Sequence, residues 1–176
     1  MKKLLGLMLV ILSFAFAQDD MNNDAMMMVE SHAWATAPLT DVVTGNEFKI
    51  ADFAGKNIYV ETFATWCPNC KKQLTEVQAV KEKMASDVFI ALSVEGADID
   101  SAALKAYAEK NGFDFIVAVA TPEVLESLVA EFGADITNPP ATPHFFISST
   151  GEAGELITGI EDANKLAEHF EMMSSN

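Results

Sequence analysis

A junction between a buried strand and a helix most constrains how this chain can fold. Residues 57–64 read NIYVETFA and are almost continuously apolar apart from Glu61, as in a strand that is covered on both faces. A stretch over residues 68–85 begins with proline and repeats apolar residues every three or four positions, the period of an amphipathic helix. The only two cysteines, Cys67 and Cys70, therefore lie where the strand ends and the helix begins.

The same alternation of apolar strands and amphipathic helices continues to the end of the chain. We predict further strands at 87–94 and 113–120, helices at 98–112, 121–133 and 161–173, and hairpins at 39–50 and 144–159. This order predicts an α/β layered domain with a central mixed sheet flanked by helices. Its first strands should be parallel with right-handed crossovers, and its last hairpin antiparallel.

The start of the chain has the pattern of a secretory signal peptide over residues 1–17. Two lysines precede a short apolar run that ends in Ala15-Phe16-Ala17. The run is shorter than the roughly 20 residues that a membrane-spanning helix needs. We therefore expect cleavage before Gln18 and an exported, periplasmic or otherwise extracytoplasmic protein, with an uncleaved N-terminal anchor as the alternative.

The next segment, residues 18–37, has no apolar periodicity and is rich in Asp, Asn and Met. This composition predicts a flexible acidic tether ahead of one domain over residues 38–176. The tether also leaves a copper-binding function open, because thioether and imidazole groups are ligands for Cu(I). The candidate ligands are Met21, Met26, Met27, Met28 and His32.

Charge excludes some partners. The chain has 26 acidic residues against 11 basic ones, none of them arginine, and a formal net charge of −15. Such a charge repels nucleic acids and anionic membrane surfaces. It makes no statement about the fold.

The cysteine pair has the position of a redox site. A helix N-terminus stabilises an anion, which lowers the pKa of a thiol such as Cys67, and Cys70 lies one turn away on the same face. A structural zinc site would need further ligands, and His32, His144 and His169 are too scattered to supply them. An inert disulfide is the remaining alternative, although so short a loop stabilises little.

These residues also resemble a known family. The stretch NIYVETFATWCPNCKKQL resembles the active-site strand and helix of the thioredoxin superfamily, and LTDVVTGNEFKIADFAGK resembles the N-terminal hairpin of its extracytoplasmic branch. That branch includes TlpA, ResA and the cytochrome c maturation proteins. The stretch PPATPHFFI is similar to the segment that carries the superfamily's cis-proline, here Pro143 after Thr142. The resemblance implies a thioredoxin-like fold with an inserted helix and strand between the two halves of the core.

The resemblance also implies roles for particular residues. Cys67 would attack a partner disulfide and Cys70 would resolve the mixed disulfide. Glu61 would be a buried acid that takes a proton from the resolving thiol, unless it lies at a sheet edge beside a lysine such as Lys56.

The substrate contacts would come from the surroundings of the cysteines. Trp66 would cover the thiols, with packing in the core as an equal alternative. A cis peptide before Pro143 would leave the N–H and C=O groups of Thr142 free for an extended substrate. A trans proline in an ordinary turn is the alternative.

The expected function is reduction of disulfides in partner proteins by a monomer that needs no cofactor or metal and takes electrons from a membrane donor. A DsbA-like oxidant and a copper-delivery protein remain alternatives. A peroxiredoxin is excluded, because its reactive cysteine needs a neighbouring arginine and this chain has none.

Overall fold

A computed structural model describes residues 32–175, so the predicted signal peptide and residues 18–31 of the predicted tether lie outside the described residues. The central sheet has four strands in the order β5-β4-β3-β6. They are β3 (Ile58–Phe63), β4 (Val88–Ser93), β5 (Ile116–Val119) and β6 (His144–Ile147). Strands β3, β4 and β5 are parallel, and β6 is antiparallel to β3, which confirms the mixed sheet.

Strand β3 lies in the middle of the sheet, between β4 and β6. Every residue of β3 is buried, as its continuous apolar character predicts. In the register, Glu61 pairs with Ala91 of β4 on one side and with His144 of β6 on the other. The antiparallel pairing places the Glu61 and His144 side chains on one face of the sheet.

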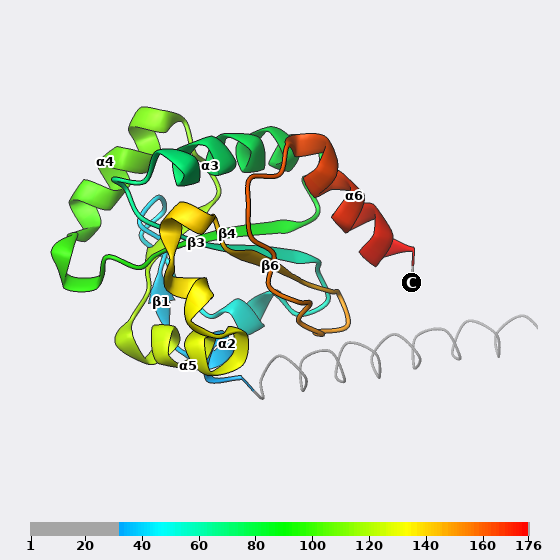
Figure 1. Cartoon of the computed structure of the whole chain (residues 1–176), viewed down its shortest axis with the longest axis horizontal. Helices are drawn as coiled ribbons and strands as arrows, with labels where there is room; N and C mark the ends of the chain where they lie inside the picture. Colours follow the sequence, from blue (N-terminus) through cyan, green and yellow to red (C-terminus); the bar gives the residue numbers. More distant parts are fainter. Residues whose placement is uncertain (1–31, 176) are drawn as a thin grey trace, which may run out of the picture.

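Helices cover both faces of the sheet (Figure 1). One layer contains α3 (Pro68–Lys81), α4 (Ser101–Asn111) and α6 (Ala163–Ser174), and the other contains α2 (Ala33–Thr36) and α5 (Pro122–Phe132). Short 3₁₀ turns are η1 (Ile50–Phe53), η2 (Gly96–Asp98), η3 (Ala134–Thr137) and η4 (Pro139–Ala141). The apolar core is correspondingly divided into one cluster on each side of the sheet.

The predicted N-terminal hairpin forms a small separate sheet of β1 (Leu39–Thr40) and β2 (Glu47–Phe48). It attaches to the edge of the central sheet beside β5. The Val42 N–H donates to the Val117 carbonyl (2.8 Å), and the Val117 N–H donates to the Asp41 carboxylate (3.2 Å). The edge strand is thereby covered, as soluble sheets require.

Three boundaries differ from the sequence prediction. Helix α3 ends at Lys81 rather than near residue 85. The closing hairpin is reduced to two isolated bridges, His144 to Ile157 and Ile147 to Ala153. The domain begins before Pro38, because Trp34 of α2 is buried in the core cluster beside α5; the tether boundary predicted at residue 37 is therefore wrong.

Within residues 32–175, no helix combines the length and the apolar character needed to cross a bilayer.

Candidate active site

The cysteine pair lies at the amino end of α3. Cys67 is the N-cap residue of the helix, and Pro68 occupies its first position. The two cysteines form a disulfide with a Cα–Cα distance of 5.3 Å, so the structure represents the oxidised form. Both sulfurs are buried, and the Cys70 N–H donates to Cys67 Sγ at 3.1 Å. After reduction the same N–H and the helix terminus would stabilise a thiolate on Cys67.

The loop before the cysteines is held by Glu95. Its carboxylate accepts hydrogen bonds from the Thr65 N–H (2.8 Å) and the Thr65 hydroxyl (2.9 Å), and from the Ser93 hydroxyl (3.1 Å). Glu95 was not among the site residues predicted from the sequence. Its position directly after the 87–94 strand was a usable signal, because the carboxyl ends of parallel strands meet at one edge of the sheet.

Trp66 extends into solvent beside the buried disulfide, with 64% of its surface exposed. Its interpretation as a core residue is therefore wrong. Whether it covers the thiols in a complex stays a prediction.

The turn η4 packs against the start of α3 at Cys70. Cys70 Sγ lies 3.0 Å from the carbonyl oxygen of Pro139. The Asn69 side-chain amide donates to the carbonyl of the exposed Pro140 at 3.1 Å. These contacts connect the start of α3 to a segment that is remote in the sequence.

The cis peptide predicted before Pro143 is wrong, since all peptide bonds in the described residues are trans. Thr142 instead adopts a left-handed conformation (φ 47°), in which it ends η4 and turns the chain into β6. Its N–H donates to the Pro139 carbonyl (2.8 Å), and its C=O accepts from His144 Nδ1 (2.9 Å). Both backbone groups predicted to be free for a substrate are therefore occupied within the protein, and Thr142 and Pro143 are buried.

Glu61 is fully buried in the central strand, so its interpretation as an edge residue beside Lys56 is wrong. Burial raises the pKa of its carboxyl well above the ordinary value of 4.5, and the hydrogen bond from Tyr59 opposes the shift only in part. The Tyr59 hydroxyl donates to Glu61 Oε2 at 2.9 Å. Burial and the Glu61 carboxyl raise the pKa of Tyr59 as well, which keeps Tyr59 a hydrogen-bond donor.

Glu61 faces the same layer as the cysteines. Tyr59 and Phe63, two residues before and after it in β3, belong to the core cluster that contains Cys67 and Cys70. Side chains two apart on a strand share a face. The structure therefore brings the predicted acid and the predicted thiols into one buried region.

Two further polar residues in this region, Tyr107 and Gln73, were not predicted from the sequence. Burial raises the pKa of Tyr107 to about 12, with Glu61 and Glu95 as smaller causes. Gln73 is buried one turn after Cys70 on α3. Among the described residues, the buried side-chain atoms without a hydrogen-bond partner are Glu61 Oε1, Gln73 Nε2 and the Tyr107 hydroxyl. Such atoms are costly unless they serve a function or bind water. The local sequence carried no signal for either residue, because both resemble ordinary residues of amphipathic helices.

Comparisons with known proteins agree with this geometry. The pattern of the Redoxin family matches residues 24–162. The chain is 26% identical over 143 residues to the thiol-disulfide oxidoreductase ResA of Geobacillus kaustophilus strain HTA426, covering 78% of this chain and 75% of that protein. ResA of Geobacillus thermodenitrificans strain NG80-2 is 22% identical over 143 residues, with the same shares covered.

Solved structures show the same fold. A thiol:disulfide interchange protein of the thioredoxin family from Chlorobium tepidum TLS matches with a TM-score of 0.64 and 25% identity, over 78% of this chain and 94% of that one. A secreted Mycobacterium tuberculosis disulfide oxidoreductase homologous to Escherichia coli DsbE matches with a TM-score of 0.59 and 16% identity, over 81% and 98%.

Proposed function

The chain belongs to the Redoxin family and is a thioredoxin-like thiol–disulfide oxidoreductase, and from that premise we propose that it is exported and reduces disulfide bonds in partner proteins. One observation carries the proposal: a cysteine pair at a helix N-terminus shares a buried layer with a carboxyl group of raised pKa. The cysteine pair supplies the nucleophile, Cys67, and the carboxyl group supplies a proton acceptor for the Cys70 thiol.

The reaction begins with the reduced protein. The Cys67 thiolate attacks one sulfur of the partner disulfide, that S–S bond breaks, and one partner sulfur leaves as a thiolate that takes a proton from water. A mixed disulfide now joins Cys67 to the partner. The Cys70 thiol loses its proton to the Glu61 carboxylate and attacks Cys67 Sγ, and the second partner sulfur leaves. Two electrons have passed to the partner, and the protein holds the Cys67–Cys70 disulfide.

The contact with the partner protein falls on the exposed surface beside the disulfide. Trp66, which precedes Cys67 in the chain, and Pro140, which accepts from the Asn69 side chain, are both exposed there. Thr142 and Pro143 support η4 from within, since both are buried. Regeneration needs an electron donor, for which we propose a membrane protein.

The direction of transfer is inferred from Glu61. A stabilised thiolate makes the reduced form more stable and the protein a stronger oxidant. An ionised carboxylate in the same layer disfavours a second negative charge, which acts in the opposite sense. Glu61 therefore favours a reducing protein.

Export is supported by the pattern of residues 1–17, which lie outside the described residues. The description of the Mycobacterium tuberculosis relative as secreted points the same way. An extracytoplasmic compartment also suits a protein whose substrates are disulfides.

The deciding experiment measures the redox potential by equilibration with glutathione and the rate of insulin disulfide reduction with dithiothreitol as electron source. We expect a redox potential nearer to the roughly −270 mV of thioredoxin than to the roughly −120 mV of DsbA. Insulin reduction should be lost in Cys67→Ser. In Cys70→Ser we expect the mixed disulfide to accumulate. A potential near the roughly −120 mV of DsbA would overturn the reductant proposal in favour of an oxidant.

A further inference from the structure

Two histidines and a glutamate form a cluster that the proposed reaction does not use. His144 begins β6, Glu161 precedes α6, and His169 lies within α6. Glu161 Oε2 lies 3.2 Å from His144 Nε2 and 3.1 Å from His169 Nε2. The His144 side chain is fully buried, whereas 14% of the Glu161 side chain and 20% of the His169 side chain are exposed.

The hydrogen-bond partners limit where the protons of this cluster can lie. His144 Nδ1 lies 2.9 Å from the Thr142 carbonyl oxygen, which can only accept, so Nδ1 carries a hydrogen. A neutral Glu161 could satisfy both histidines only by donating to one Nε2 atom and accepting from the other, whereas an ionised Glu161 accepts from both. With Glu161 ionised, His144 carries hydrogens on both ring nitrogens and is an imidazolium.

The His144 ring lies across the strand pair from Glu61. The two residues are directly opposite in the antiparallel register of β3 and β6, which places their side chains on one face of the sheet. The His144 ring packs 5.4 Å from the ring of Tyr59, whose hydroxyl donates to Glu61. A positive charge on the His144 ring, directly across the strand pair, would favour the ionised form of the Glu61 carboxyl.

We propose that His144, held in its charged form by Glu161, is a positioning residue that makes Glu61 an effective proton acceptor for the Cys70 thiol near neutral pH. The proposal rests on the proposed function, in which Glu61 takes that proton. It resolves a conflict in the site: burial alone would keep Glu61 protonated and unable to accept.

The groups that face His144 come from four directions. Tyr59 and Glu61 face it from β3, Glu161 from the loop before α6, and His169 from α6 through its contact with Glu161. On the α3 side the neighbour is the uncharged Gln73, whose Oε1 accepts from the Glu161 N–H at 2.8 Å. Glu161 is thus the one carboxylate in direct contact with the His144 ring among the described residues. No group of His, Cys, Asp and Glu side chains in this part of the chain is arranged to hold a metal ion.

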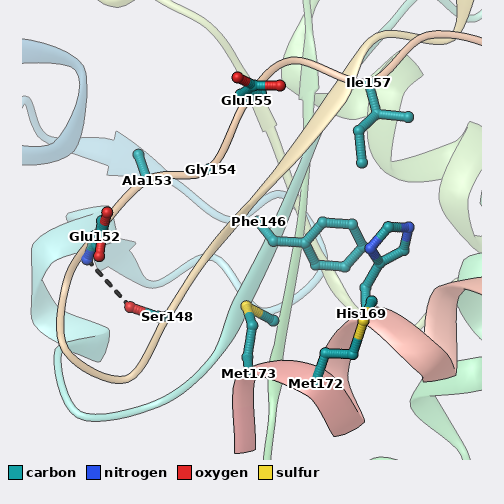
Figure 2. A pocket seen from close by; sticks show the side chains of 10 residues that line it. All are labelled: Phe146, Ser148, Glu152, Ala153, Gly154, Glu155, Ile157, His169, Met172 and Met173. Atoms are coloured by element: carbon teal, nitrogen blue, oxygen red, sulfur yellow. Dashed lines mark hydrogen bonds between the residues drawn. The ribbon is translucent and has the colours of Figure 1, made fainter. Parts of the chain in front are cut away.

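The outer end of the cluster reaches the surface at a separate pocket. His169 stacks on Phe146, with ring centroids 4.6 Å apart, and both line a pocket of about 440 Å³ together with Ile157, Met172 and Met173 (Figure 2). Neither cysteine lines this pocket. The outer end of the cluster therefore meets solvent at a pocket that the cysteines do not line.

The test compares the pH profile of insulin reduction in the wild type and in His144→Gln. Turnover should rise with pH as Glu61 ionises. Loss of the positive ring should move the midpoint of this rise to higher pH by at least about one unit, the shift that an opposite charge at close range produces. Glu161→Gln removes the counter-ion of the His144 ring and should move the midpoint in the same direction. This variant replaces His144→Gln as the test if His144→Gln does not fold.

The matched control is His32→Gln. His32 makes a histidine–glutamate contact of the same kind with Glu131 (2.6 Å), but it lies beside Trp34 on the opposite face of the sheet. This variant should leave the midpoint unchanged. An unchanged midpoint in His144→Gln and Glu161→Gln would overturn the inference while leaving the proposed function standing, whereas an inactive wild type would overturn the proposed function itself.

A second measurement does not depend on activity. The ¹⁵N chemical shifts of the His144 ring at pH 7 distinguish an imidazolium from either neutral tautomer. We expect the imidazolium pattern in the wild type and its loss in Glu161→Gln. A neutral ring in the wild type would overturn the inference.

Discussion

Cys67 and Cys70 are chemically different residues although both are buried and only three positions apart. The Cys67 sulfur lies at the N-cap and accepts the Cys70 N–H, whereas the Cys70 sulfur faces the carbonyl oxygen of Pro139. An N–H group stabilises a thiolate, and a carbonyl oxygen instead accepts from a protonated thiol. A hydrogen bond to a charged group contributes roughly 1.5–3 kcal/mol. In the reduced protein the negative charge therefore belongs on Cys67.

The first prediction follows from this difference. Iodoacetamide applied to the reduced protein near neutral pH should label Cys67 several-fold faster than Cys70, and peptide mapping by mass spectrometry identifies the labelled residue. The labelling rate should level off above the pKa of Cys67, which a helix N-terminus lowers from about 8.5. Preferential labelling of Cys70 would contradict the assignment of the nucleophile.

Glu61 gives the second prediction at the residue scale, on stability rather than rate. Its pKa in the folded protein is raised above the ordinary value of 4.5 by burial. The folded state then binds the proton more tightly than the unfolded chain, so the stability linked to Glu61 is fully present below about pH 4.5 and is lost as the pH rises through the raised folded pKa.

Urea unfolding of the disulfide form from pH 4 to pH 9 checks this prediction. The free energy of unfolding of the wild type should fall with pH by up to about 1.4 kcal/mol per unit relative to Glu61→Gln, which cannot ionise. Glu126→Gln, at an exposed glutamate of α5, should behave as the wild type. Equal pH slopes in the wild type and Glu61→Gln would contradict the raised pKa.

Among the elements, the short helix α2 shows how a segment without apolar periodicity becomes part of the core. Trp34 packs edge-on against Phe145 of β6, with ring centroids 5.3 Å apart. Its backbone N–H donates to the Ser127 hydroxyl of α5 at 3.0 Å. A single turn of helix is not stable alone, so α2 exists because its tryptophan is buried against α5 and β6.

The third prediction concerns this element. Trp34→Ala should lower the free energy of unfolding by about 3–5 kcal/mol, because it removes a large buried ring. Trp66→Ala is the matched control: the same substitution at the exposed tryptophan should change stability by less than about 0.5 kcal/mol, yet slow insulin reduction. Denaturant unfolding measures the stability of both variants. A small effect at Trp34 would contradict the placement of α2 in the core.

At the scale of the whole molecule, the two faces of the sheet serve different purposes. The face covered by α3, α4 and α6 holds the cysteines, Glu61 and the histidine cluster, whereas the face covered by α2 and α5 holds none of them. The groups proposed for the reaction are therefore gathered in one of the two layers. The whole chain carries a formal net charge of −15, which favours solubility.

The fourth prediction concerns the N-terminus of the exported protein. The exported protein should begin at Gln18, because residues 1–17 have the pattern of a cleaved signal peptide. Intact mass spectrometry of the protein from the extracytoplasmic fraction measures this directly. A mass that includes Met1–Ala17 would instead support an N-terminal anchor.

The sequence by itself determined the alternation of strands and helices and the position of the cysteines at a helix start, but left Glu61 open between a buried acid and a residue at the sheet edge. These features depend on the local period of apolar residues and on capping residues such as Thr121 and Asp100, which act within a few positions of the chain. The resemblance to thioredoxins added the fold and the roles of the cysteines. It misled at Thr142 and Pro143, where a left-handed residue makes the turn.

Only the tertiary structure decided which polar groups meet. Glu95 reaches Thr65 because β3 and β4 end at one edge of the sheet, and His144 faces Glu61 because β6 pairs with β3 in one particular register. A shift of that register by one residue would place His144 on the other face. Register and packing are set by the balance of many contacts between distant segments, and no short stretch of this sequence contains them.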